Sequence, residues 1–203
     1  PVCVLAALIL LHVVLHCCAK HLIRLFLWQA GLPGLARTVD DRYHVLSAEA
    51  QRALNRLVRS HIYYVIAGPL GAYLLYGHLT WDLAVVMRGY TPLHGAAFLL
   101  AISHWIVALV EDALTPNFFD TVVTMQEGPH VRFSRYHLYL LHHLVAALAF
   151  GFCLWTRALP AMGACGLLFE LPVAFVNARD LLRDFDRELR WFRPLGGWFT
   201  LDL

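Results

Sequence analysis

The chain alternates between long apolar runs and shorter polar segments. Five of the runs have about the length that a helix needs to cross a bilayer, which is roughly 20 residues. We therefore predict five membrane-spanning helices, at about residues 2–18, 61–79, 92–110, 135–155 and 160–178. The predicted fold class is an all-α, polytopic transmembrane helix bundle, which forms a single membrane domain over residues 1–203.

The polar segments between the spans add interfacial helices to this picture. Residues 47–60 carry apolar side chains at helical spacing with arginines between them, and Ser47 is a suitable N-cap. Residues 179–193 also carry apolar side chains at helical spacing, and their polar face holds charges of both signs. We expect both helices to lie in the membrane interface, with the first turning into the second span near His61. Residues 80–91 and 113–134 are predicted loops, and a tight turn at 157–160 predicts an antiparallel hairpin of the fourth and fifth spans.

Composition and charge support this layout. Hydrophobic residues make up 60% of the chain and charged residues 15%, against about 25% charged residues in soluble domains. Of the sixteen Lys and Arg residues, all but Arg88 and Arg157 fall on one side of the predicted membrane. That asymmetry agrees with the positive-inside rule and places the basic side in the cytoplasm or the mitochondrial matrix. Basic residues spread along a membrane face indicate anionic lipid headgroups as partners and not nucleic acid.

Ionisable residues inside the spans are the candidate functional residues. His104, the adjacent pair His142 and His143, and Glu170 lie on three different spans, about 10–15 Å below the basic surface. Such groups are costly in a bilayer unless they are paired, so they indicate a functional site. Because the fourth and fifth spans form the predicted hairpin, we expect one histidine of the pair to contact Glu170.

The residue types favour acid–base chemistry. A histidine held by a carboxylate can take a proton from an amine or hydroxyl, or can carry an acyl group itself. We therefore select His142, His143 and Glu170 as candidate catalytic residues. The candidate lipid-binding residues are His104, Asn177, Arg179 and Arg135. A purely structural polar cluster, fastening helices with about 1 kcal/mol per bond, is the alternative.

Other chemistries find less support. His12 and His16 lie four residues apart, but the chain lacks the repeated histidine boxes of membrane di-iron enzymes. The five cysteines lie in apolar runs without metal-ligand spacing. We therefore expect no metal site and no bound cofactor.

Two segments resemble a known family. Tyr-Leu-Leu-His142-His143-Leu-Val-Ala-Ala-Leu-Ala-Phe is followed, after a short turn, by Gly-Leu-Leu-Phe-Glu170-Leu-Pro-Val-Ala-Phe-Val-Asn177-Ala-Arg179. This combination is similar to the TLC-domain family, which includes ceramide synthases and a ceroid-lipofuscinosis protein of the endoplasmic reticulum. The resemblance covers about residues 42–190 and implies a core of six or seven helices, of which this chain holds five. Ceramide synthases carry a His-Asp-x-x-Asp element after the His pair, where this chain has Glu170 as its single acid.

The resemblance implies a membrane protein of lipid metabolism. In the first hypothesis the chain transfers an acyl group, with acyl-CoA as a possible donor substrate, to a lipid amine or hydroxyl, and Glu170 orients the catalytic histidine. In the second it is a non-catalytic subunit that binds lipid or packs against other membrane subunits in a larger complex. The family implies the endoplasmic reticulum, with the mitochondrial inner membrane as the alternative.

Overall fold

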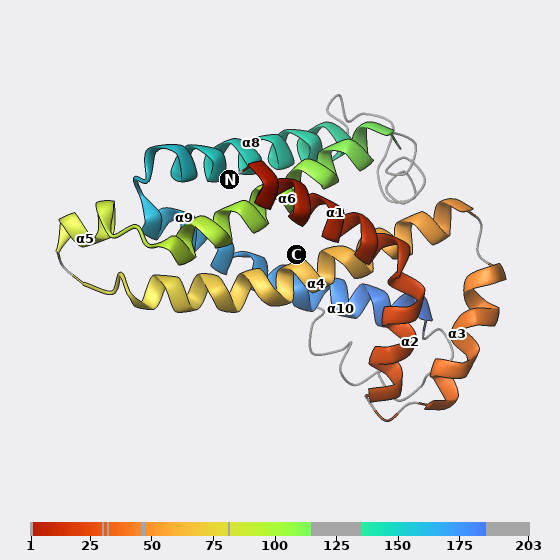
Figure 1. The fold of residues 1–203 in the computed structure, drawn as a ribbon. Helices are drawn as coiled ribbons and strands as arrows, with labels where there is room; N and C mark the ends of the chain where they lie inside the picture. The colour runs from red at the N-terminus through yellow and green to blue at the C-terminus, as the bar shows by residue number, and fades with distance from the viewer. Residues whose placement is uncertain are drawn as a thin grey trace.

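The computed structural model describes residues 2–29, 31, 33–45, 48–80, 82–114 and 135–185, and every regular element in these ranges is a helix (Figure 1). The helices are α1 (Val2–Cys17), α2 (Ala19–Gln29), α3 (Pro33–Val45), α4 (Ala48–Tyr76), α5 (Leu83–Arg88), α6 (Pro92–Leu114), α8 (Arg135–Thr156), α9 (Pro160–Leu168) and α10 (Glu170–Phe185). The predicted all-α class is therefore confirmed for the described part of the chain.

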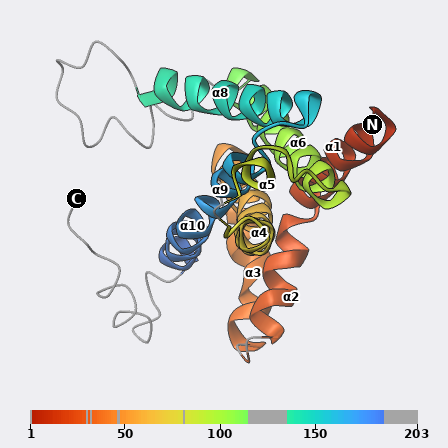
Figure 2. The ribbon, with the colours of Figure 1, turned by 90° about the vertical axis from the view of Figure 1, so that its left-hand side faces the viewer.

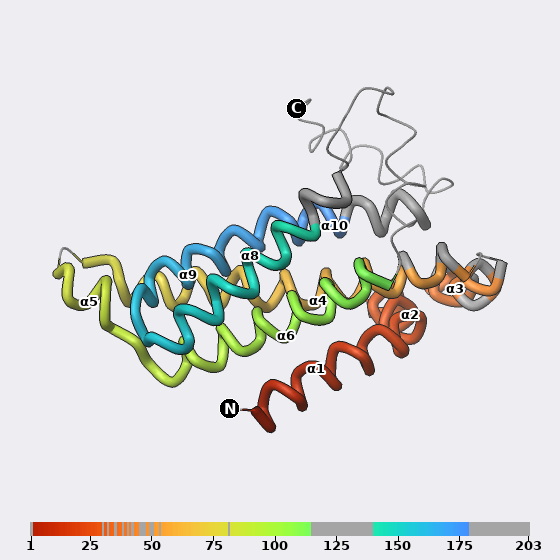
Figure 3. The backbone as a smooth tube through the Cα atoms, turned by 90° about the horizontal axis from the view of Figure 1, so that it is seen from above, coloured from red at the N-terminus to blue at the C-terminus, as the bar shows by residue number. Residues whose placement is uncertain are grey.

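The long helices form a bundle around α4 and α6. α6 packs against α8 and α1, whereas α4 packs against α9 and α10. Figure 3 shows these helices running side by side, and Figure 2 shows α1 and α10 on opposite sides of the α4–α6 pair. α2 and α3 pack on each other at the end of the bundle where α4 begins, and α5 lies at the opposite end (Figure 1).

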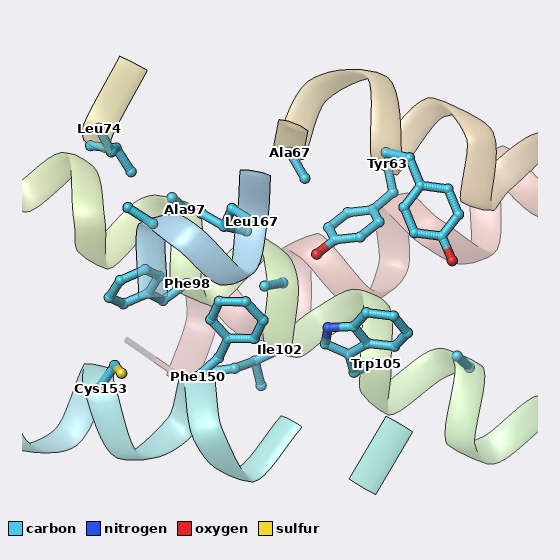
Figure 4. Close-up of a cluster of buried hydrophobic side chains, with 14 of the residues drawn as sticks. Tyr63, Ala67, Leu74, Ala97, Phe98, Ile102, Trp105, Phe150, Cys153 and Leu167 are labelled. Atoms are coloured by element: carbon cyan, nitrogen blue, oxygen red, sulfur yellow. The ribbon is translucent and has the colours of Figure 1, made fainter. Parts of the chain in front are cut away.

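A buried apolar core holds the bundle together. Figure 4 shows Phe98 and Trp105 of α6 facing Phe150 of α8, with Leu167 of α9 and Tyr63 of α4 completing the core. Between membrane helices, such packing stabilises the bundle through van der Waals contacts. The core thus lies between α4, α6, α8 and α9, and it fixes how their polar residues face one another.

Two glycines of α4 allow α9 and α10 to approach closely. A Cβ atom at Gly71 would lie 2.5 Å from the backbone nitrogen of Leu168 and 2.8 Å from the carbonyl oxygen of Ala164. A Cβ atom at Gly68 would lie 2.8 Å from Cβ of Leu171. Small residues at a helix contact are typical of membrane proteins, because they bring two backbones within van der Waals distance.

Fewer segments qualify as membrane spans than the five predicted. By length and apolar composition, the described helices contain two candidate spans, Pro92–Leu114 and Pro160–Ala178. α1 and α2 would supply a third only if the pair, bent by 71°, counts as one span. The apolar part of α8, Leu140–Thr156, is shorter, and α4 shares its length with an arginine-rich first half. The five-span prediction is therefore not confirmed.

Local structure also departs from prediction at several points. α4 is one continuous helix, so the expected turn near His61 is absent. Helix α5 lies within residues 80–91, which were predicted to be a loop, and it begins where the Asp82 side chain accepts a hydrogen bond from the backbone N–H of Ala84. Helix α3 lies in a polar segment for which no element was predicted. The predicted N-cap Ser47, most of the predicted loop 113–134, and residues 186–193 lie outside the described residues.

The predicted turn after the fourth span is present. Arg157 and Leu159 have φ angles of 52° and 56°, a left-handed conformation that reverses the chain, and Pro160 begins α9. The two arms of the hairpin then diverge, since α8 packs mainly on α6 and α9 mainly on α4.

Candidate functional site

The centre of the site is a contact between His143 of α8 and Asp112 of α6. Nδ1 of His143 lies 2.6 Å from Oδ2 of Asp112, and both side chains are buried. The packing of α8 on α6 brings them together, because Asp112 lies in the last turn of α6 and His143 in the first half of α8. The carboxylate partner of the histidine is therefore Asp112, and the expected contact with Glu170 is wrong.

Two arginines of α4 and one histidine of α1 extend this contact into an ion-pair cluster, made of Arg56, Arg59, Glu111, Asp112 and His16. Arg56 pairs with Asp112. Nη2 of Arg59 lies 2.8 Å from Oε2 of Glu111, and Nδ1 of His16 lies 3.2 Å from its Oε1. Two guanidinium groups and two carboxylates thus face one another in the described part of the cluster.

In a neutral His143, the contact with Asp112 decides which of the two ring nitrogens carries the proton. A carboxylate only accepts hydrogen bonds, so Nδ1 of His143 is the nitrogen that donates to Asp112. The lone pair of the neutral ring is then on Nε2. A histidine oriented by a carboxylate in this way is the arrangement of a general base.

Aromatic rings surround the histidine on the inner side. The ring centroid of Trp105 lies 4.9 Å from that of His143 and 5.5 Å from that of His142. Next along α6, His104 stacks on Tyr63 with 3.8 Å between ring centroids. The neighbouring ring of His12 on α1 lies 5.5 Å from that of His104. The pair of His143 and Asp112, here called the dyad, thus adjoins a buried row of aromatic rings. This ring belt runs from α8 through α6 and α4 to α1 and consists of Trp105, His104, Tyr63 and His12.

Comparison with known families agrees with the arrangement. The family model described as the TLC domain matches residues 54–201. That match includes α4 from Leu54, α6, α8, α9 and α10, which carry most of the site. The chain belongs to the TLC-domain family. No curated protein and no solved structure matches it. Membership in this family indicates an integral membrane protein whose role involves lipids.

Within this TLC domain, the other predicted site residues occupy different positions. His142 is exposed on α8, with its ring edge toward Trp105. Glu170 begins α10, is buried at 7% exposure, and interacts electrostatically with Tyr63. Asn177 is half-buried on the same helix. Glu170 is therefore close enough to Tyr63 for an electrostatic interaction, and it contacts no histidine among the described residues.

The remaining lipid-binding candidates are placed only in part. His104 is buried at 1% exposure within the ring belt. Arg135 and Arg179 lie in α8 and α10, and their side chains lie outside the described residues. In the described part of the TLC domain, no group of three or more His, Cys, Asp or Glu residues has the geometry of a metal site.

Sequence reasoning missed the ion-pair cluster. The predicted interfacial helix placed Arg56 and Arg59 at the membrane surface, and Asp112 was not among the candidate residues. The structure instead buries Arg59 completely. The available signal was charge complementarity: two arginines three residues apart on α4, and two adjacent acids at the end of α6.

A second buried histidine pair lies at the opposite end of the TLC domain. The backbone N–H of Thr91 donates to Nδ1 of His94 at 3.1 Å, so Nε2 of the neutral ring carries the proton. That Nε2 donates to Nε2 of His78 at 3.0 Å, and Nδ1 of His78 donates to the carbonyl of Val85 at 3.1 Å. The chain of bonds ties α4, α5 and α6 together beside an open cavity of about 400 Å³.

Replacing His94 by leucine is expected to destabilise this end of the bundle. The substitution leaves Nε2 of His78 without its donor, and an unsatisfied buried polar group costs about 1–3 kcal/mol. The measurement is the thermal unfolding midpoint in detergent of His94→Leu, His78→Phe and the double variant. Because the two residues share one bond, the double variant should lose less than the sum of the singles. Additive losses would contradict the hydrogen-bond chain.

Proposed function

We propose that this TLC-domain protein transfers an acyl group to the amine or hydroxyl of a membrane lipid, with His143 as general base. The observation that carries the proposal is the 2.6 Å contact between His143 and Asp112 in a buried setting. Asp112 takes the orienting role that the sequence suggested for Glu170. An acyl-CoA is the donor substrate that the family resemblance suggests.

In the proposed reaction, His143, Asp112 and Arg56 each have a separate role. Nε2 of His143 takes the proton from the acceptor amine or hydroxyl as that group attacks the acyl carbonyl. Asp112 keeps the imidazole in the required tautomer and stabilises the imidazolium that forms. Arg56, paired with Asp112, favours the ionised carboxylate. The thiolate of the donor then leaves and recovers the proton from His143.

His142 has a different position and therefore a different proposed role. Its ring is exposed on α8 beside Trp105, with 5.7 Å between its centroid and that of His143. An exposed imidazole next to the base can contact the substrate directly, so His142 is proposed to position the donor or carry its acyl group. Such an acyl group would form an acyl-imidazole as the thiolate leaves.

The ion-pair cluster also favours a second candidate function. The same contacts fasten α1, α4, α6 and α8 to one another at one end of the bundle. A non-catalytic subunit, which binds lipid or packs against other membrane subunits, would need such a fastening without a reaction. The endoplasmic reticulum is the proposed compartment for either function, and the mitochondrial inner membrane is the alternative.

Replacing His143 by glutamine separates the two functions. Purified protein in liposomes would receive acyl-CoA of several chain lengths and a mixture of long-chain amines and alcohols, and new amides or esters would be measured by mass spectrometry. Loss of a general base is expected to lower the rate by about 10²–10⁴-fold. The matched control is His44→Gln, because His44 is exposed on α3.

Two results would count against catalysis. A folded His143→Gln protein that keeps the wild-type rate would exclude His143 as the base. Wild-type protein that is folded but forms no product with any donor and acceptor would favour the accessory function.

A further inference from the structure

The junction of α1, α4 and α6 contains an unusual number of buried polar atoms without partners. Nε and Nη1 of Arg59, both ring nitrogens of His12, Nδ1 of His104 and the hydroxyl of Tyr63 have no hydrogen-bond partner among the described residues. Each of these side chains is at most 2% exposed. Buried polar groups in folded proteins are nearly always hydrogen-bonded, so a group of orphans indicates a missing ligand or water.

The orphaned groups belong to one place. The ring of His12 lies 5.5 Å from that of His104 and 6.4 Å from that of Tyr63. Arg59 stands one helical turn before Tyr63 on α4 and interacts electrostatically with both histidines. The three helices pack on one another here. The orphans therefore form a single polar junction, which adjoins the ion-pair cluster through Arg59 and the His143–Asp112 pair through Trp105.

Two of the orphaned atoms, Nε and Nη1 of Arg59, can only donate hydrogen bonds. An arginine side chain only donates, and Arg59 is held at one nitrogen by Glu111, which His16 also approaches. The nearest carboxylates are thus already in use. A phosphate group brings several acceptor oxygens and forms charge-assisted hydrogen bonds with arginine.

Charge and depth agree with a lipid phosphate. Arg59 brings a positive charge to the junction, and a phosphate would bring the opposite charge. The junction adjoins the ion-pair cluster, at the end of the bundle where the arginines of α4 lie. The outer face of α1 carries exposed apolar side chains such as Leu10, Leu11 and Val14, which suit acyl chains.

We propose that the junction of α1, α4 and α6 binds the phosphate group of a membrane lipid through Arg59, His12 and His104. The hydroxyl of Tyr63 bounds the site on its inner side. The acyl chains of the lipid pack on the outer face of α1. This subsite differs from a surface site for anionic headgroups, because the side chains that would bind the phosphate are fully buried. It does not depend on the proposed acyl transfer, since binding involves no turnover.

Lipid binding by the purified full chain in a phosphate-free maltoside detergent tests the proposal. The probes are phosphatidic acid, diacylglycerol with the same acyl chains, and glycerol 3-phosphate, with affinities measured by native mass spectrometry. We expect phosphatidic acid to bind at least tenfold more tightly than diacylglycerol. Arg59→Gln and His12→Phe should each weaken phosphatidic acid binding at least tenfold. Arg52→Gln, an exposed arginine about two turns earlier on α4, should change it less than twofold.

The variants keep the test decisive if one of them is unstable. His12→Phe preserves the shape of an aromatic ring and leaves the Arg59–Glu111 pair intact, so it remains informative if Arg59→Gln fails to fold. Equal binding of diacylglycerol, or unchanged affinity in His12→Phe, would overturn the proposal and assign the orphaned atoms to water. Equal binding of glycerol 3-phosphate would also overturn it, because the ligand would then be a soluble phosphate ester.

Discussion

Replacing Asp112 by asparagine is expected to abolish most acyl transfer, by about 10²–10⁴-fold. The amide can present a donor to Nδ1 of His143, which would favour the tautomer with its lone pair on the wrong nitrogen. Arg56 would also lose the carboxylate that it pairs with. Breaking one partner of a buried ion pair costs about 3–5 kcal/mol, so the variant should also unfold more easily.

The experiment separates these two effects. Activity in liposomes and the thermal unfolding midpoint would be measured for Asp112→Asn and for the control Asp82→Asn. Asp82 lies at the opposite end of the bundle, and asparagine keeps the oxygen that caps α5. A loss of rate at a temperature where the variant remains folded supports the dyad. A folded Asp112→Asn protein with the wild-type rate would exclude it.

Replacing Gly71 by alanine is expected to destabilise the packing of α4 against α9. The added methyl would lie within 2.8 Å of backbone atoms of Leu168 and Ala164, which cannot rotate away. Overpacking of this kind costs about 1–3 kcal/mol. Because α9 leads directly into α10, the displacement should also move Glu170 relative to Tyr63.

Gly151→Ala on α8 is the matched control. It also lies within a helix, but an added Cβ there meets nothing within 4 Å. Alanine favours a helix over glycine by about 1 kcal/mol, so this control should be neutral or slightly stabilising. The measurement is the thermal unfolding midpoint of both variants in the same detergent. Equal midpoints would show that α4 and α9 do not approach each other as closely as described.

The sequence predicted the family and half of the dyad. An adjacent histidine pair in an apolar helix is a local signal, and His143 could be selected from it because intramembrane histidines need partners. The sequence also predicted a helix at about residues 92–110, which is observed as Pro92–Leu114, and the turn after residue 156, because long apolar runs and Pro160 are local features. These predictions needed no knowledge of which helices pack together.

The partner of His143 could not be predicted in this way. The short turn after α8 made Glu170 the nearest candidate, but Gly68 and Gly71 hold α9 and α10 against α4. α8 packs instead on α6, which brings Asp112 to His143 across 31 residues of sequence. The pairing of the helices depends on how well the side chains of distant segments fit together. A single sequence does not show that fit.

The burial of charged side chains was the other feature that the local sequence pattern did not predict. Arg59 lies on an amphipathic segment that predicted an interfacial helix, yet its guanidinium is buried against Glu111, 52 residues away. The bend between α1 and α2 has a similar origin, since α2 packs against α3 and the start of α4 and does not continue α1.

The most direct test is an experimental density map of the protein bound to an acyl donor whose thioester is replaced by an unreactive thioether, together with a long-chain amine. The amine nitrogen is expected to lie within hydrogen-bond distance of Nε2 of His143, about 2.6–3.2 Å, while Nδ1 remains bonded to Asp112. Lipid density confined to the outer faces of the bundle, with no ligand near His143, would contradict it.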